Sequence, residues 1–158
     1  CVLMSLLIVI GFMDWDTMEI SDIIVLLIFI LAIPLALFTD DVPLKHRIIG
    51  ALCISVPFFI IGEVSRPIIR KKFGEDFRAI EQGDTLLMLA AGAVLGTQAI
   101  IVSTFLGIII AAIGGAIIKH VTKDSKFPFG PFLSIGIALG ALWGEKLADL
   151  YLSLISVE

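Results

Sequence analysis

Residues 85–118, TLLMLAAGAVLGTQAIIVSTFLGIIIAAIGGAII, decide the fold class because this stretch of 34 residues contains no charged side chain. A helix needs about 20 mostly apolar residues to cross a bilayer, and somewhat fewer if it is short or broken. We therefore divide the stretch into two membrane helices, residues 85–96 and 99–118. The strands of a membrane barrel would alternate between polar and apolar residues, and this stretch does not alternate.

The remainder of the chain has the same apolar character. Of its 158 residues, 59% are hydrophobic and 16% are charged. A soluble domain has about 45–50% apolar residues, with glycine counted, and about 25% charged residues. The composition therefore excludes an ordinary soluble domain and predicts an all-α fold, a polytopic membrane bundle of about six transmembrane helices. The predicted spans are residues 2–13, 23–39, 48–65, 85–96, 99–118 and 129–143.

The two ends of the chain carry further expectations. Residues 2–13 lack the basic flank and the small-residue cleavage site of a signal peptide. We expect them to form a membrane helix that is truncated at its start, because the chain begins with Cys1 rather than Met. Residues 145–155 are amphipathic, and they either lie at the interface or extend the sixth span. Cys1 and Cys53 are too few for a disulfide framework or a zinc tetrad.

Positive charge is concentrated in two of the predicted loops, those after the third and fifth spans. Both loops lie on the same side of the membrane, and the positive-inside rule places that side in the cytoplasm. The net charge of −4 argues against nucleic acid as a partner. The basic residues of these loops are Arg66, Arg70, Lys71, Lys72, Arg78, Lys119, Lys123 and Lys126.

Two aspartates border predicted spans at this cytoplasmic side: Asp14 follows the first span, and Asp84 opens the fourth. Two carboxylates that lie close together cannot both ionise easily, so one would hold a proton and act as an acid while the other activates water as a base. This is the chemistry of an aspartyl protease, which needs no metal and no other cofactor. The alternative is that each aspartate is a solvated charge at a helix end, as we expect for Asp16 and Asp22.

The sequence around these aspartates resembles the type IV prepilin peptidase family of GxGD intramembrane aspartyl proteases. In DWDTMEISD, residues 14–22, the first aspartate is followed seven positions later by Ser21, where the family usually has the Pro of an Ile-Pro-Asp motif. In EQGD, residues 81–84, the last two residues match the end of the Gly-x-Gly-Asp motif. A Leu-rich helix follows the second block, as it does in the family.

A third block, FPFGPFL, looks like the Pro-Phe-Gly-Pro segment that opens a late helix of the family. The resemblance implies that Asp14 and Asp84 are the catalytic residues of one catalytic membrane domain, residues 1–158. The chain has no counterpart of the cysteine-tetrad segment of longer members, so we expect proteolysis without methyl transfer. The supporting motif residues are Gly83, Pro128, Gly130 and Pro131.

The resemblance also implies the reaction and the partners. The chain would be an aspartic endopeptidase that removes the leader of type IV prepilin-like or pseudopilin precursors, in pilus assembly or type II secretion. It would lie in the inner (plasma) membrane, with its active site facing the cytoplasm and with lipid around it. The substrate would present a short basic leader on the cytoplasmic side and an apolar stem in the membrane.

The sequence departs from the family pattern at three positions. Glu81 replaces the first glycine of the GxGD motif, Leu86 stands where the family often has Lys, and Ser21 replaces the Pro. Glu81 would add a carboxylate that raises the pKa of a nearby aspartate. Ser21 loses a rigid bend but is able to cap the helix that follows.

Three other functions remain open at this stage. A preflagellin peptidase or another GxGD intramembrane protease would keep the two aspartates and change the substrate. An inactive pilus-assembly scaffold would bind precursors without cleaving them. A transporter would use Asp14, Glu63 and Asp84 as a proton or ion relay, although transporters place such acids near the bilayer midplane.

Overall fold

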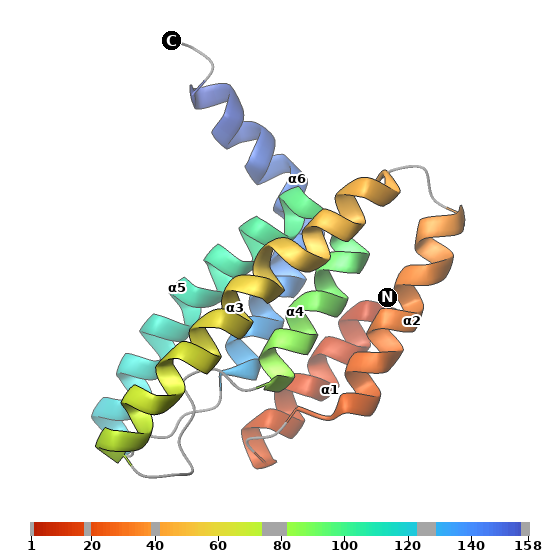
Figure 1. The fold of residues 1–158 in the computed structure, drawn as a ribbon. Helices are drawn as coiled ribbons and strands as arrows, with labels where there is room; N and C mark the ends of the chain where they lie inside the picture. The colour runs from red at the N-terminus through yellow and green to blue at the C-terminus, as the bar shows by residue number, and fades with distance from the viewer. Residues whose placement is uncertain (1, 18–19, 39–41, 74–81, 123–128, 156–158) are drawn as a thin grey trace.

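The computed structural model describes residues 2–17, 20–38, 42–73, 82–122 and 129–155. Over these residues the chain is all-helical, with six α-helices and no β-strand (Figure 1). This confirms the prediction of an all-α fold. In chain order the helices are α1 (Val2–Thr17), α2 (Asp22–Phe38), α3 (Leu44–Phe73), α4 (Gln82–Leu95), α5 (Thr97–Thr122) and α6 (Gly130–Ile155).

A single glycine divides the long apolar stretch into two helices. α4 ends at Leu95, and Gly96 follows in the left-handed conformation with a φ of +79°. The Gly96 N–H donates to the carbonyl of Gly92 at 2.9 Å, a closure typical of helix C-termini where glycine is left-handed. α5 begins at Thr97 and runs back along the bundle in the opposite direction (Figure 1).

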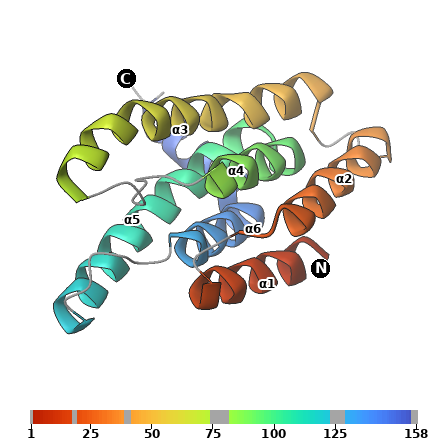
Figure 2. The ribbon, with the colours of Figure 1, turned by 60° about the horizontal axis from the view of Figure 1, so that its bottom comes forward.

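α4 is the central helix of the bundle. It packs against α2, α3, α5 and α6, whereas α1 packs against α6 and α2. Figure 2 shows α4 between α3 on one side and α2 and α6 on the other. Leu87, Met88 and Ala91 are among its fully buried side chains. The position of the α4 N-terminal turn is therefore fixed by packing along the rest of this helix.

Two of the helix crossings are close because glycines face each other. At the α3–α4 crossing, a Cβ added to Gly92 would lie 2.6 Å from the carbonyl carbon of Gly50. At the α5–α6 crossing, a Cβ added to Gly136 would lie 2.5 Å from the Cα of Gly107. Membrane helices associate through such small residues because the backbones then approach closely and gain packing contacts.

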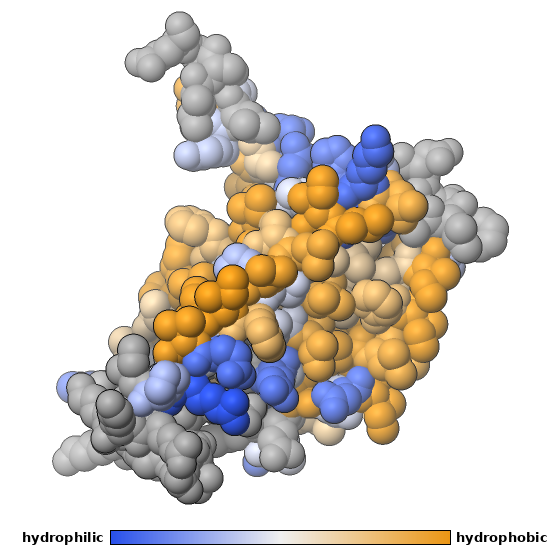
Figure 3. All heavy atoms as spheres, viewed as in Figure 1, coloured by the Kyte–Doolittle hydropathy of each residue, from blue (hydrophilic) through white to orange (hydrophobic). Residues whose placement is uncertain are grey.

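Two helices are long and apolar enough to cross a membrane, over Leu44–Pro67 of α3 and Thr97–Ile118 of α5. Only 22% and 28% of their most apolar windows are buried inside the protein, so they are not the core helices of a soluble domain. Figure 3 shows an apolar belt across the middle of one face, with hydrophilic residues at both ends of the belt. α2 and α4 contain shorter apolar segments, Asp22–Leu35 and Gln82–Leu95.

Several helices continue beyond the predicted spans. The structure places Arg66 and the basic residues 70–72 in α3 and Lys119 in α5, where we expected loops. Lys and Arg are good helix formers, so a helix need not end where its sequence becomes charged. α6 includes residues 145–155, which therefore extend the sixth helix, and its C-terminal part projects beyond the bundle (Figure 1). Three other basic residues of the predicted loops lie outside the described residues: Arg78, Lys123 and Lys126.

Candidate active site

Asp14 lies in the last turn of α1 and is buried, with 4% of its surface exposed. Its Oδ2 accepts a hydrogen bond of 2.9 Å from the backbone N–H of Gly130, the first residue of α6. The N–H groups at a helix N-terminus lack partners within the helix and carry partial positive charge. The first turn of α6 therefore holds the Asp14 carboxylate in place.

Gly130 allows this contact because it has no side chain. A Cβ at this position would lie 2.7 Å from Oδ2 and 2.8 Å from Cγ of Asp14. Any other residue would push the carboxyl away from the helix N-terminus. The structure thus gives a physical reason for the glycine of the third sequence block, which we had expected only to support the site.

The environment of Asp14 favours its protonated form. Asp14 follows the apolar residues 2–13, and burial raises the pKa of its carboxyl above the ordinary value of 3.8. The hydrogen bond from Gly130 lowers the pKa by a smaller amount, because it stabilises the ionised form. A carboxyl of this kind keeps its proton at a higher pH than a solvated aspartate does.

Asp84 lies in the first turn of α4 and is also 4% exposed. The preceding residue, Gly83, packs against the chain that joins α1 to α2: a Cβ at Gly83 would lie 2.8 Å from the Cβ of Ile20. Ile20 is itself buried in the hydrophobic core. This contact places the N-terminal turn of α4 next to the segment that follows Asp14.

The two aspartates lie at the same end of the bundle. The C-terminal end of α1 and the N-terminal ends of α4 and α6 gather there (Figure 1), and α1 and α4 both pack against α2 and α6. Burial of Asp14 and Asp84 contradicts the alternative of two solvated helix-end charges, whereas Asp16 and Asp22 are exposed as expected. That the two carboxylates form a catalytic pair stays a prediction.

The structure describes only some of the other motif residues that the sequence analysis named. Pro131 lies in the first turn of α6, next to Gly130. Ser21 directly precedes α2, and its carbonyl accepts the N–H of Val25 at 3.2 Å, as expected for the residue that caps a helix. Pro128 and Glu81 lie outside the described residues.

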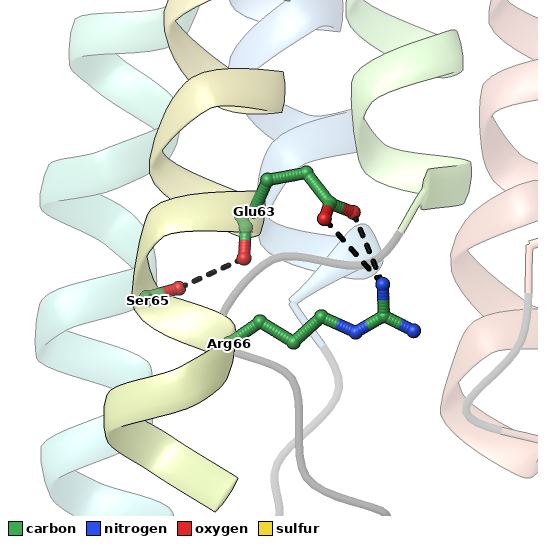
Figure 4. Close-up of polar contacts among 4 residues, drawn as sticks. Glu63, Ser65 and Arg66 are labelled. Carbon is green, nitrogen blue, oxygen red and sulfur yellow. Dashed lines mark hydrogen bonds and ion pairs between the residues drawn. The ribbon is translucent and has the colours of Figure 1, made fainter.

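Glu63 does not join the two aspartates through any contact that the structure shows. It forms an ion pair of 3.4 Å with Arg66, one turn further along α3, and both side chains are about half exposed (Figure 4). Such exposed pairs contribute little to stability. The pair does not provide the third member of a buried carboxylate relay.

Arg47 directly precedes the predicted span of residues 48–65, and its role was not predicted from the sequence. Arg47 lies in α3 and is 4% exposed. Its Nη1 donates to the carbonyl of Val94 at 2.7 Å, and other guanidinium nitrogens reach the carbonyls of Val42 and Leu35 at 3.2 and 3.3 Å. Arg47 thus caps the C-terminal end of α4, the helix that carries Asp84 at its other end. A single Arg beside apolar residues was the only signal in the sequence.

The fold and the site place this protein in the class of helix bundles that have an apolar surface and two buried carboxyl groups at one end. Within that class, the chain belongs to the type IV leader peptidase family, whose sequence profile matches residues 1–116. The matched region includes both aspartates and ends before the third sequence block. Family membership confirms the resemblance from which Asp14 and Asp84 were chosen.

Curated relatives agree with this assignment. The chain is 28% identical over 152 residues to a prepilin leader peptidase/N-methyltransferase of Aeromonas salmonicida (strain A449), which covers 94% of this chain and 50% of the relative. It is 29% identical over 134 residues to one of Neisseria gonorrhoeae, covering 85% of this chain and 44% of the relative. The chain therefore spans about half the length of the curated relatives it matches. No solved structure matches it significantly.

Proposed function

We propose that this chain is an aspartic endopeptidase that removes the leader peptide of type IV prepilin-like or pseudopilin precursors. Family membership supports a leader peptidase. The observation that carries the proposal is the burial of Asp14 and Asp84 at one end of the bundle, with Asp14 held at the N-terminus of α6. Burying a carboxylate is unfavourable, so two buried carboxyls at one end of the bundle are typical of a site rather than of a surface.

In the proposed mechanism the two carboxyls share one proton. The ionised member removes a proton from water, which attacks the scissile carbonyl, and the protonated member delivers its proton to the departing amine. The raised pKa of Asp14 supports a pair that retains a proton at a higher pH than a solvated aspartate does. The pair titrates as a unit. As proposed, the reaction uses only the two carboxyls and water.

We place this chemistry at the cytoplasmic edge of the inner membrane. α3 and α5 supply two spans, and the proposal includes the remaining helices as membrane helices, about six in all. The basic residues at the C-terminal end of α3, Arg66 and residues 70–72, are at the same end of the bundle as the start of α4. By the positive-inside rule, that end faces the cytoplasm.

The test is cleavage of a co-expressed prepilin by variants of each aspartate. We expect Asp14→Asn and Asp84→Asn each to slow cleavage by about 100- to 10,000-fold, the usual contribution of an acid or base group. Asp149→Asn is the matched control, because Asp149 is an exposed aspartate near the C-terminal end of α6, the opposite end from Gly130, and this variant should cleave normally. Parental cleavage by either buried variant would refute the pair, and binding without cleavage by the parent protein would favour the scaffold.

A further inference from the structure

A groove of about 500 Å³ lies between α1 and α6. Along α1 its lining extends from Met4 to Trp15, which is about 16 Å of helix at a rise of 1.5 Å per residue. Along α6 it extends from Pro131 to Ala138. One end of the groove is therefore adjacent, on both helices, to the hydrogen bond between Asp14 and Gly130.

The groove wall contains one polar side chain, Ser134, which is 5% exposed. Its Oγ has no hydrogen-bond partner among the described residues. Buried helix serines usually bond the carbonyl one turn back, as Ser55 and Ser103 do at 2.5 and 2.7 Å. The Ser134 hydroxyl therefore lacks a hydrogen-bond partner in an otherwise apolar groove, and a polar group of a bound ligand would supply one.

Among the described residues, α1 and α6 together have acidic side chains and no basic side chain at the end of the groove next to the candidate site. Residues 1–44 contain no Lys, Arg or His, and α6 has no basic residue before Lys146. Asp16 and Asp22 are exposed at this end, near the buried Asp14. The charge therefore complements a ligand that is basic where it meets the site and apolar along the groove.

We propose that this groove binds the apolar stem of the precursor, with the basic leader at the acidic end; this inference rests on the proposed function. The stem binds as a helix lying along α1 and α6 for about three turns. Ser134 donates its hydroxyl to a polar group of the stem. A phospholipid is a poorer occupant, because its phosphate would meet Asp16 and Asp22.

Photo-crosslinking tests the groove directly. Benzoylphenylalanine replaces Ile135, which lines the groove and is 47% exposed. In the control it replaces Ile113, which lies on α5 outside the groove lining and is 59% exposed. The substitutions are made in the Asp84→Asn variant, co-expressed with a prepilin that has a basic leader and an apolar stem. We expect a precursor adduct from position 135 and none from position 113. Equal adducts from both positions, labelling of phospholipid alone, or no precursor adduct from position 135 would overturn the proposal.

Groove filling gives a second, kinetic test. Ala138→Phe adds bulk to the groove away from Asp14, so KM for the precursor should rise about tenfold while kcat stays the same. Ala112→Phe, on an exposed position of α5, should leave both constants unchanged. An unchanged KM in Ala138→Phe would contradict the groove.

The crosslink separates this inference from the proposed function. An adduct from position 135 with a parent protein that fails to cleave supports the groove and refutes the peptidase. Cleavage by the parent with no adduct from position 135 refutes the groove and leaves the peptidase standing.

Discussion

Replacing Gly130 with alanine puts a methyl group where the Asp14 carboxylate lies. The added Cβ would be 2.7 Å from Oδ2 and 2.8 Å from Cγ, so the carboxyl must move and its 2.9 Å hydrogen bond to the backbone N–H is lost. The backbone itself tolerates alanine, because Gly96 is the only described glycine with a positive φ. The effect of Gly130→Ala therefore acts through Asp14.

The size of the effect follows from the hydrogen bond. Bonds to charged groups contribute about 1.5–3 kcal/mol. Because 1.36 kcal/mol corresponds to a tenfold change in rate, kcat/KM should fall by about 10- to 150-fold. Loss of the bond also raises the pKa of Asp14 further, since the bond lowers it now. The acid limb of the pH–rate profile should therefore move to higher pH.

The assay is cleavage of a purified prepilin in detergent over a range of pH, together with thermal unfolding of each variant. Gly107→Ala is the matched control: its added Cβ would meet the end of the Leu133 side chain at 3.3 Å, and it touches neither aspartate. We expect this control to keep the parental rate and pH profile. A Gly130→Ala variant with the parental rate and an unmoved acid limb would refute the role assigned to the α6 N-terminus.

Two further predictions concern stability. Since the pKa of Asp14 is raised, the folded state binds more protons than the unfolded state above pH 3.8, and stability should fall as pH rises from that value. In thermal unfolding between pH 4 and 7, Asp14→Asn should remove this pH dependence, whereas Asp16→Asn should not. An equal fall of stability with pH in the parent and in Asp14→Asn would contradict the prediction. Arg47→Met leaves buried carbonyls without their donor, so we expect it to lower the unfolding free energy by about 2–4 kcal/mol. The control Lys45→Met changes an exposed residue of the same helix and should lower it by almost nothing. If Arg47→Met stays within about 0.5 kcal/mol of the parent, Arg47 does not cap α4.

Helical structure and the division of the apolar stretch could be predicted because both depend on local sequence. Length and hydropathy identify the helices, and a glycine such as Gly96 ends one helix and allows the next. The helix ends were placed less well, because α3 and α5 continue into basic residues. Hydropathy reports where lipid contact ends, whereas helical hydrogen bonding continues into water.

The site was only partly predictable for a different reason. Asp14 and Asp84 were found through motifs, but position in the sequence left open whether they are solvated, and only the packing of distant helices shows that they are buried. The contact between Asp14 and Gly130 joins residues 116 positions apart, and the hydrogen bond from Arg47 to Val94 of α4 joins residues 47 positions apart. Such contacts depend on how the helices pack, which composition and spacing do not report.

The central claim is that the Asp14 and Asp84 carboxyls act on one water molecule. The most direct measurement is an experimental structure with a hydroxyl-bearing peptide inhibitor that spans the cleavage site. We expect an oxygen of each carboxyl within about 2.6–3.2 Å of the inhibitor hydroxyl, the reach of a catalytic hydrogen bond. An inhibitor held by one aspartate alone, with packed side chains separating it from the other, would contradict the account.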